Sequence, residues 1–117
     1  AITDLREVAE AFGLRVFGHS RDDPASVLAS HVVVSTTPRN VADALVPALS
    51  SAPGVLLDVV YSPWPTSLAG AWAAAGGQVV SGLEMLVGQA GRQVELMTGR
   101  SAPLDVMLAA GLTAMGR

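Results

Sequence analysis

The sequence contains neither cysteine nor lysine. Without cysteine, the chain can form no disulfide and offers no thiolate nucleophile or thiolate metal ligand. Without lysine, it has no Schiff-base amine, no phosphate-loop lysine and no lysine general base. Its seven basic residues are all arginines, and ten acidic residues give a net charge of −3. This acidic balance, with no basic cluster, argues against nucleic acid as a partner.

Long apolar runs are also missing. No stretch approaches the roughly 20 residues that a membrane helix needs, and the N-terminus lacks the pattern of a secretion signal. We therefore expect no membrane partner and a cytoplasmic location. The two histidines, His19 and His31, have no carboxylate at metal-ligand spacing, so we expect no metal site. Half of the 117 residues are hydrophobic, which is typical of one domain with a compact core.

Hydrophobic periodicity alternates along the chain between helical spacing and short apolar runs, which predicts an α/β fold with a parallel sheet. Strands are expected over residues 14–17, 31–34, 54–61 and 78–80. Helices are expected over residues 3–12, 23–29, 66–75 and 82–97, and from Pro103 onward. Another is expected after a cap at Asn40, where Pro47 should break or kink the helix. The run at 31–34 is typical of a strand buried on both sheet faces.

Ligands of open α/β sheets bind beyond the carboxyl ends of the strands, so the loops at 35–38, 58–66 and 81–82 are the candidate sites. Hydroxyl residues in the first loop suit a ring or phosphate close to the backbone, or satisfy their own backbone amides. Tyr61 brings a phenol to the second loop, either for a ligand or for a nearby carbonyl. Asp58 needs partners because it is a carboxylate in an apolar strand; it either caps a helix start or loop amides, or contacts a ligand.

The helix predicted from Gly82 adds one further candidate. Gln89 falls about 110° from the centre of its apolar stripe, at the rim of the buried face. There its amide can hydrogen-bond a polyol ligand or be solvated. The sequence has no G-x-S-x-G, H-E-x-x-H, phosphate-loop or G-x-G-x-x-G motif, so we assign no catalytic residue to this chain.

Several segments together resemble the C-terminal half of the shikimate dehydrogenase family in sequence, order and spacing. They are Val32-Val-Val-Ser-Thr-Thr-Pro38, Asp58-Val-Val-Tyr-Ser-Pro-Trp-Pro-Thr66, Ser81-Gly-Leu-Glu-Met-Leu-Val-Gly-Gln89 and Glu95-Leu-Met-Thr-Gly99. The resemblance covers essentially the whole chain. It implies an NADP-dependent oxidoreductase that interconverts 3-dehydroshikimate and shikimate in the pathway to chorismate and aromatic amino acids.

The resemblance also implies two sets of binding residues. Tyr61 and Gln89 match family positions that contact shikimate. The expected cofactor contacts are Val59, Gly82, Thr36, Thr37 and Met85, of which Val59 and Gly82 match positions at the nicotinamide end. Ser35 stands where the family commonly has an asparagine, so this chain lacks the hydrogen-bonding amide of that position.

The family's catalytic lysine and aspartate, its glycine-rich phosphate loop and its N-R-[ST] segment for the 2′-phosphate have no counterpart in these residues. We therefore expect residues 1–117 to be the C-terminal portion of a Rossmann-type NADP-binding domain, including the C-terminal helices, without the N-terminal substrate domain. The expected fold is a three-layer, mostly parallel sheet of about four strands with helices on both faces, lacking the first βαβ unit.

Such a fragment is expected to be inactive alone. It is also expected to leave the strand at 14–17 without neighbours, which would leave that strand unpaired, move it to a new sheet edge or favour a strand-exchanged homodimer. Two alternative functions stay open on the sequence. One is a quinate/shikimate dehydrogenase paralogue that uses NAD, and the other is a non-catalytic α/β module.

Overall fold

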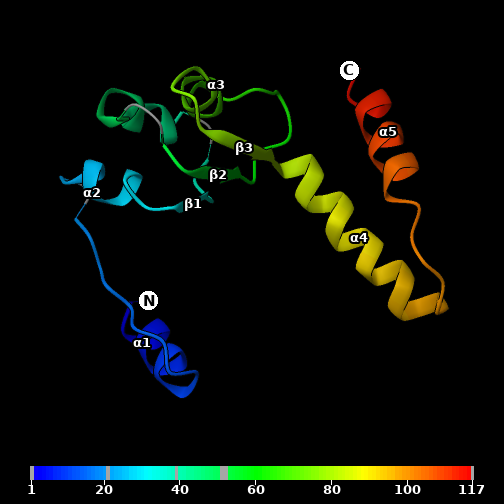
Figure 1. The fold of residues 1–117 in the computed structure, drawn as a ribbon, viewed down its shortest axis with the longest axis horizontal. Coiled ribbons are helices and arrows are strands. Elements are labelled where there is room, and N and C mark those ends of the chain that lie inside the picture. Colours follow the sequence, from blue (N-terminus) through cyan, green and yellow to red (C-terminus); the bar gives the residue numbers. More distant parts are fainter. Residues whose placement is uncertain (1, 21, 39, 51–52, 117) are drawn as a thin grey trace.

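The structure is a computed structural model that describes residues 2–20, 22–38, 40–50 and 53–116. Its strands are β1 (Val32–Ser35), β2 (Val55–Asp58) and β3 (Gln78–Ser81), which pair in parallel in the order β1-β2-β3. The helices are α1 (Ile2–Ala11), α2 (Pro24–Leu28), the 3-10 helix η1 (Ala42–Ala48), α3 (Ser67–Ala74), α4 (Gly82–Thr98) and α5 (Leu104–Ala114). Figure 1 shows this arrangement, and it confirms the predicted α/β class with a parallel sheet.

The predicted strand at residues 14–17 is wrong. This segment has no regular structure, and Leu14 and Phe17 are 62% and 69% exposed. A short apolar run forms a strand only where a neighbouring strand pairs with its backbone. In Figure 1, α1 and the segment after it lie well away from the sheet, so none of the described strands pairs with this segment. The described sheet therefore has three strands where about four were expected.

The core lies between one face of the sheet and the helices α2, η1 and α3. Alternate strand residues face these helices, with Leu56 at the centre and Val33 and Val79 beside it. Trp72 of α3 is fully buried in the same cluster as Leu56, and its indole N–H donates a hydrogen bond of 3.0 Å to the Gly54 carbonyl oxygen. The core thus ties α3 to the start of β2.

The opposite face of the sheet is not covered by a helix in the described part of the chain, contrary to the three-layer expectation. Val32 and Val34 of β1 are 59% and 54% exposed, although the sequence predicted a strand buried on both faces. Crossover connections between parallel strands are right-handed. Two successive crossovers that run in the same direction across a sheet therefore place their helices on the same face. The order β1-β2-β3 therefore accounts for the single helical layer.

The helix starts predicted for α2 and α3 are confirmed with side-chain caps, but the cap predicted for η1 is wrong. Asp23 accepts a hydrogen bond from the Ser26 N–H and caps α2, and Thr66 caps α3 as predicted. Asn40 does not cap a helix, because its backbone is left-handed (φ 72°) and Val41 takes the capping position without a side-chain bond. The following turns are 3-10, with Pro47 inside.

The helices α4 and α5 form a hairpin that projects from the carboxyl end of β3 (Figure 1). Two glycines allow the close contact between them. A Cβ atom on Gly91 would lie 2.3 Å from a methyl carbon of Leu104, and one on Gly111 would lie 2.7 Å from a methyl carbon of Leu83. Within the described residues, none of the helices has the length and hydrophobicity to cross a membrane.

Candidate functional site at the carboxyl edge of the sheet

The last residues of the three strands are polar, buried and aligned. Ser35, Asp58 and Ser81 are partners in the strand register, and only 7%, 1% and 6% of their surfaces are exposed. Each one hydrogen-bonds to the segment that follows its own strand. This polar row therefore fixes the three loops that the sequence singled out as candidate sites.

Ser35 connects the first loop to the second. Its carbonyl oxygen accepts a hydrogen bond of 3.1 Å from the Val59 N–H, and its hydroxyl lies 3.4 Å from that of Thr37. Thr36 is exposed and Thr37 is half-buried. Thr37 also lines a cavity of about 560 Å³ between α2 and η1, together with His19.

Asp58 organises the second loop. Its Oδ2 accepts a hydrogen bond of 2.6 Å from the Thr66 hydroxyl, and its Oδ1 accepts one of 3.2 Å from the Val60 N–H. The Thr66 oxygen in turn accepts the Ala69 N–H at 3.1 Å, in the first turn of α3. Of the two roles that the sequence left open for Asp58, the structure shows the one within the protein: Asp58 binds a loop amide and the hydroxyl of Thr66, which caps α3.

The second loop rests directly on the start of α4. The Gly82 N–H donates a hydrogen bond of 3.3 Å to the Val60 carbonyl oxygen. A Cβ atom at Gly82 would lie 2.1 Å from the Val59 carbonyl oxygen, so this contact requires a residue without a side chain. Val59 and Gly82, two of the predicted cofactor-binding residues, are thereby in contact.

A capping box holds the start of α4. The Ser81 hydroxyl accepts the Glu84 N–H at 3.3 Å, and the Glu84 carboxylate accepts the Ser81 N–H at 2.7 Å and its hydroxyl at 2.8 Å. Sequence reasoning missed this pair, although S-x-x-E before an apolar run is a recognised signal for it. The box fixes the end of β3 and the helix as one unit.

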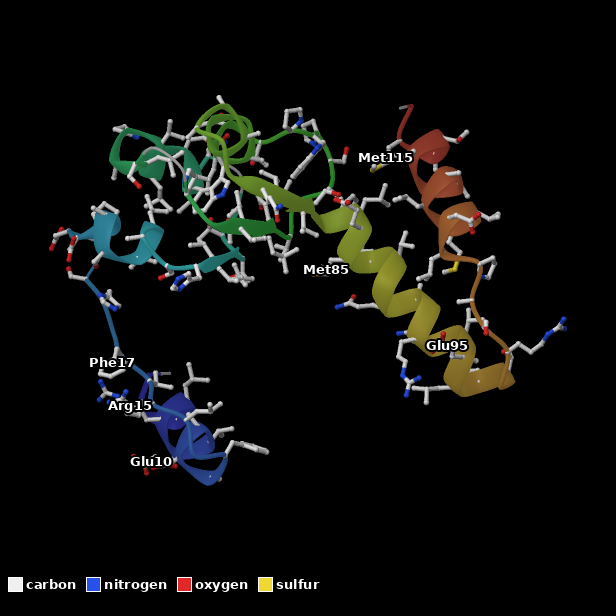
Figure 2. All side chains as sticks on the ribbon, viewed as in Figure 1. Glu10, Arg15, Phe17, Met85, Glu95 and Met115 are labelled. Carbon is white, nitrogen blue, oxygen red and sulfur yellow. The ribbon has the colours of Figure 1, made fainter. Side chains whose placement is uncertain are left out.

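The other predicted residues, Met85, Gln89 and Tyr61, belong to α4 and the second loop, the two elements that meet at Gly82. Met85 and Gln89 are three and seven residues after Gly82 in α4, so all three lie on one side of the helix. Met85 is half-buried, and Figure 2 shows it on the part of α4 nearest the sheet. Gln89 is exposed, as a rim residue should be. Tyr61 is 49% exposed in the second loop, directly after Val60.

The predicted site residues thus lie on the segments that follow the carboxyl ends of the three strands. The second loop and the start of α4 are joined by direct contacts, and the first loop is linked to them through the bond between Ser35 and Val59. These segments carry the phenol of Tyr61, the amide of Gln89 and the hydroxyls of Thr36 and Thr37, together with the apolar side chains of Val59 and Met85. These groups can bind and orient a polar ring.

Comparison with known proteins finds similar sequences and structures. Residues 82–110 match the family described as Shikimate 5'-dehydrogenase C-terminal domain. A shikimate dehydrogenase (NADP(+)) from Pelobacter propionicus is 31% identical over 114 residues, covering 87% of this chain and 40% of the relative. The crystal structure of a shikimate 5-dehydrogenase from Mycobacterium fortuitum superposes with a TM-score of 0.76 at 38% identity, covering 93% of this chain and 41% of that one.

Along most of its length, the chain is similar to part of these shikimate dehydrogenases. The shikimate dehydrogenase of Thermus thermophilus, solved in complex with shikimate, matches 95% of the chain with a TM-score of 0.69 and 25% identity. It too is covered only in part, to 41% of its length. The chain therefore spans about two fifths of the length of these relatives, and its fold is that part of the family's Rossmann-like architecture.

Proposed function

We propose that the chain is the C-terminal portion of the NADP-binding domain of a cytoplasmic shikimate dehydrogenase. The whole enzyme would reduce 3-dehydroshikimate to shikimate with NADPH, in the biosynthesis of chorismate and aromatic amino acids. Relatives named for this activity and cofactor, matched along most of the chain, support the proposal. The composition, with no basic cluster and no cysteine, agrees with a small-molecule enzyme.

One observation carries the proposal: the bond between the Gly82 N–H and the Val60 carbonyl oxygen joins the Tyr61 loop to α4. This joint brings two elements that carry polar side chains to the carboxyl edge of the sheet, where α/β folds bind their ligands. We assign Tyr61 and Gln89 to the substrate. The phenol can donate or accept a hydrogen bond, and the amide can do both at once, which suits the hydroxyl groups of shikimate.

The same edge fits the nicotinamide end of NADP. Val59 and Met85 supply half-buried apolar surface, and Gly82 lets α4 begin directly against the Val59 backbone. We assign these residues to that end of the cofactor, and Thr36 and Thr37 to the loop that passes beside it. When bound, NADPH supplies the hydride for the reduction. The described residues contain no glycine-rich loop for the diphosphate, so the fit is to this end of the cofactor alone.

The chain by itself should not catalyse the reaction. Both oxygens of the buried Asp58 are engaged by Thr66 and Val60, so this carboxylate is not available to a ligand. The family's catalytic lysine and aspartate have no counterpart in the sequence.

An assay of NADP reduction tests the proposal. Shikimate is the substrate, and parallel arms with quinate and with NAD test the paralogue alternative. The 117-residue chain should give no rate, whereas a chain extended by its upstream coding sequence should be active with shikimate and NADP. An inactive extended protein would contradict the proposal and favour a non-catalytic module.

We also propose that the isolated chain forms a homodimer with exchange of the segment around α1. The apolar side chains of this segment and of the uncovered sheet face support it. Leu5, Val8 and Phe12 of the α1 segment are more than half exposed, as are Val32 and Val34 of β1. An amphipathic helix and an open apolar sheet face are complementary surfaces, and burial of both in a second copy would stabilise the pair.

A further inference from the structure

Asp58 is placed to do more than cap a helix, because its two oxygens hold two separate points of one loop. Oδ1 accepts the N–H of Val60, two residues along the chain, and Oδ2 accepts the hydroxyl of Thr66, eight residues along. Tyr61 lies between these two points. The carboxylate is 1% exposed, so no ligand at the surface can reach it, and these two bonds offset the cost of burying it.

The direction of the hydrogen bonds requires an acceptor at position 58. The Thr66 hydroxyl donates its hydrogen to Asp58, and its oxygen accepts the Ala69 N–H. The Val60 N–H is likewise only a donor. An ionised carboxylate accepts at both oxygens, whereas an amide accepts at one and would present an N–H group to the second donor. Asparagine at position 58 can therefore keep one of the two bonds but not both.

Val60 is held on both of its sides. Its N–H is bonded to Asp58, and its carbonyl oxygen accepts the N–H of Gly82 at the start of α4. The backbone that leads into Tyr61 is therefore fixed relative to the helix that carries Met85 and Gln89. The bond of Asp58 to Thr66 fixes the far end of the same loop relative to α3.

We propose that Asp58 is a positioning residue for Tyr61: its carboxylate holds both ends of the loop over residues 59–66, and this fixes the backbone that carries the phenol relative to the first turn of α4. The inference deepens the proposed function and relies on it only for the identity of the ligand that Tyr61 meets. The positioning itself exists without a ligand and is tested without one.

The test uses NMR spectra of the 117-residue chain, in which Tyr61 is the only tyrosine and gives one set of ring signals. Asp58→Asn should move the Tyr61 ring signals toward those of an unstructured tyrosine and should shift the Gly82 amide. The indole N–H of Trp72, which reports on the core, should stay unchanged. Asp105→Asn, the same substitution on the exposed first turn of α5, is the matched control and should move none of these signals.

The Gly82 amide separates positioning from simple helix capping. If Asp58 only supported the cap of α3, its substitution would move the Ala69 amide and leave Tyr61 and Gly82 in place, which would overturn the proposal. If the native Trp72 indole signal disappears in Asp58→Asn, the core of that variant is disrupted, and variants of Thr66 are tested in its place. Thr66→Val removes the hydroxyl and should displace Tyr61, whereas Thr66→Ser keeps it and should not. Equal Tyr61 signals in these two variants would overturn the proposal.

Failure of the proposed function would look different. In that case shikimate would leave the wild-type Tyr61 signals unmoved, while Asp58→Asn would still displace them. Conversely, a Tyr61 signal that responds to shikimate but not to Asp58→Asn would overturn the positioning role alone.

Discussion

The backbone of Val59 lies so close to Gly82 that a side chain on the glycine would put a carbon atom 2.1 Å from the Val59 carbonyl oxygen. The second neighbour of that carbon would be the Val59 carbonyl carbon, at 2.5 Å, so the obstacle is backbone and cannot rotate away. The contact joins the loop that carries Tyr61 to the helix that carries Met85 and Gln89. It makes the joint between β2 and α4 sensitive to a single methyl group.

Gly82→Ala should therefore destabilise the chain. Forcing a methyl group into a filled space costs about 1–3 kcal/mol, and we expect a loss in this range in the free energy of unfolding, measured with urea. Gly88→Ala is the matched control in the same helix, since no heavy atom lies within 4 Å of its added carbon. That control should raise stability by about 0.5–1 kcal/mol, through helix propensity. Equal effects of the two substitutions would contradict the close contact.

The capping box at the start of α4 leads to a second prediction. Ser81→Ala removes the hydroxyl that bonds to both the Glu84 N–H and the Glu84 carboxylate, so it should cost about 1 kcal/mol of unfolding free energy. Ser67→Ala makes the same change at the exposed first residue of α3, whose cap is the neighbouring Thr66, and should have little effect. Urea unfolding followed by circular dichroism measures the free energy of unfolding of both variants. An unchanged free energy in Ser81→Ala would contradict a stabilising capping box.

The bond from Trp72 to Gly54 should contribute measurably to stability. Trp72→Phe leaves a carbonyl oxygen without its indole donor and creates a small cavity, so the free energy of unfolding should fall by about 2 kcal/mol or more. Trp64→Phe serves as control, because Trp64 is only half-buried at the edge of the same core. The loss at Trp64 should be less than half of that at Trp72, as measured by thermal or urea unfolding.

The uncovered sheet face predicts self-association. Replacing Val32 and Val34 together by threonine keeps the β-branched shape but makes the exposed face polar. The double variant should shift the mass measured by light scattering from dimer toward monomer and should bind less of a hydrophobic dye. A wild-type chain that is monomeric at all concentrations would contradict the exchanged dimer.

Much of this fold follows from patterns within single segments. Thr66 before an apolar helix, the helix over 82–97 and the apolar runs of β1, β2 and β3 were all predicted near their observed positions. These features depend on neighbours in sequence: a capping side chain bonds to an amide three residues away, and a helical stripe repeats every three or four residues. The candidate loops could be placed for the same reason, because they follow the strands.

What could not be predicted depends on partners distant in the sequence. The apolar run at 14–17 resembles a strand but has no neighbour to pair with, and Val32 and Val34 resemble core residues but lie on an uncovered face. The contact of Gly82 with Val59 spans 23 residues and leaves no local signal. The role of Asp58 could be narrowed to two possibilities from its apolar surroundings, and only the positions of Val60 and Thr66 decided between them.

The central claim is that the edge formed by the Tyr61 loop and α4 is half of a shikimate site. Titration of the isotope-labelled 117-residue chain with shikimate tests it most directly, by following the Tyr61 ring and the Gln89 side-chain amide. We predict that both signals shift along one saturating binding curve. Tyr61→Phe or Gln89→Ala should lower the apparent affinity for shikimate, whereas Gln93→Ala, on an exposed residue one turn further along α4, should leave it unchanged. Shikimate that leaves Tyr61 and Gln89 unmoved, or moves only residues around the cavity between α2 and η1, would contradict the account.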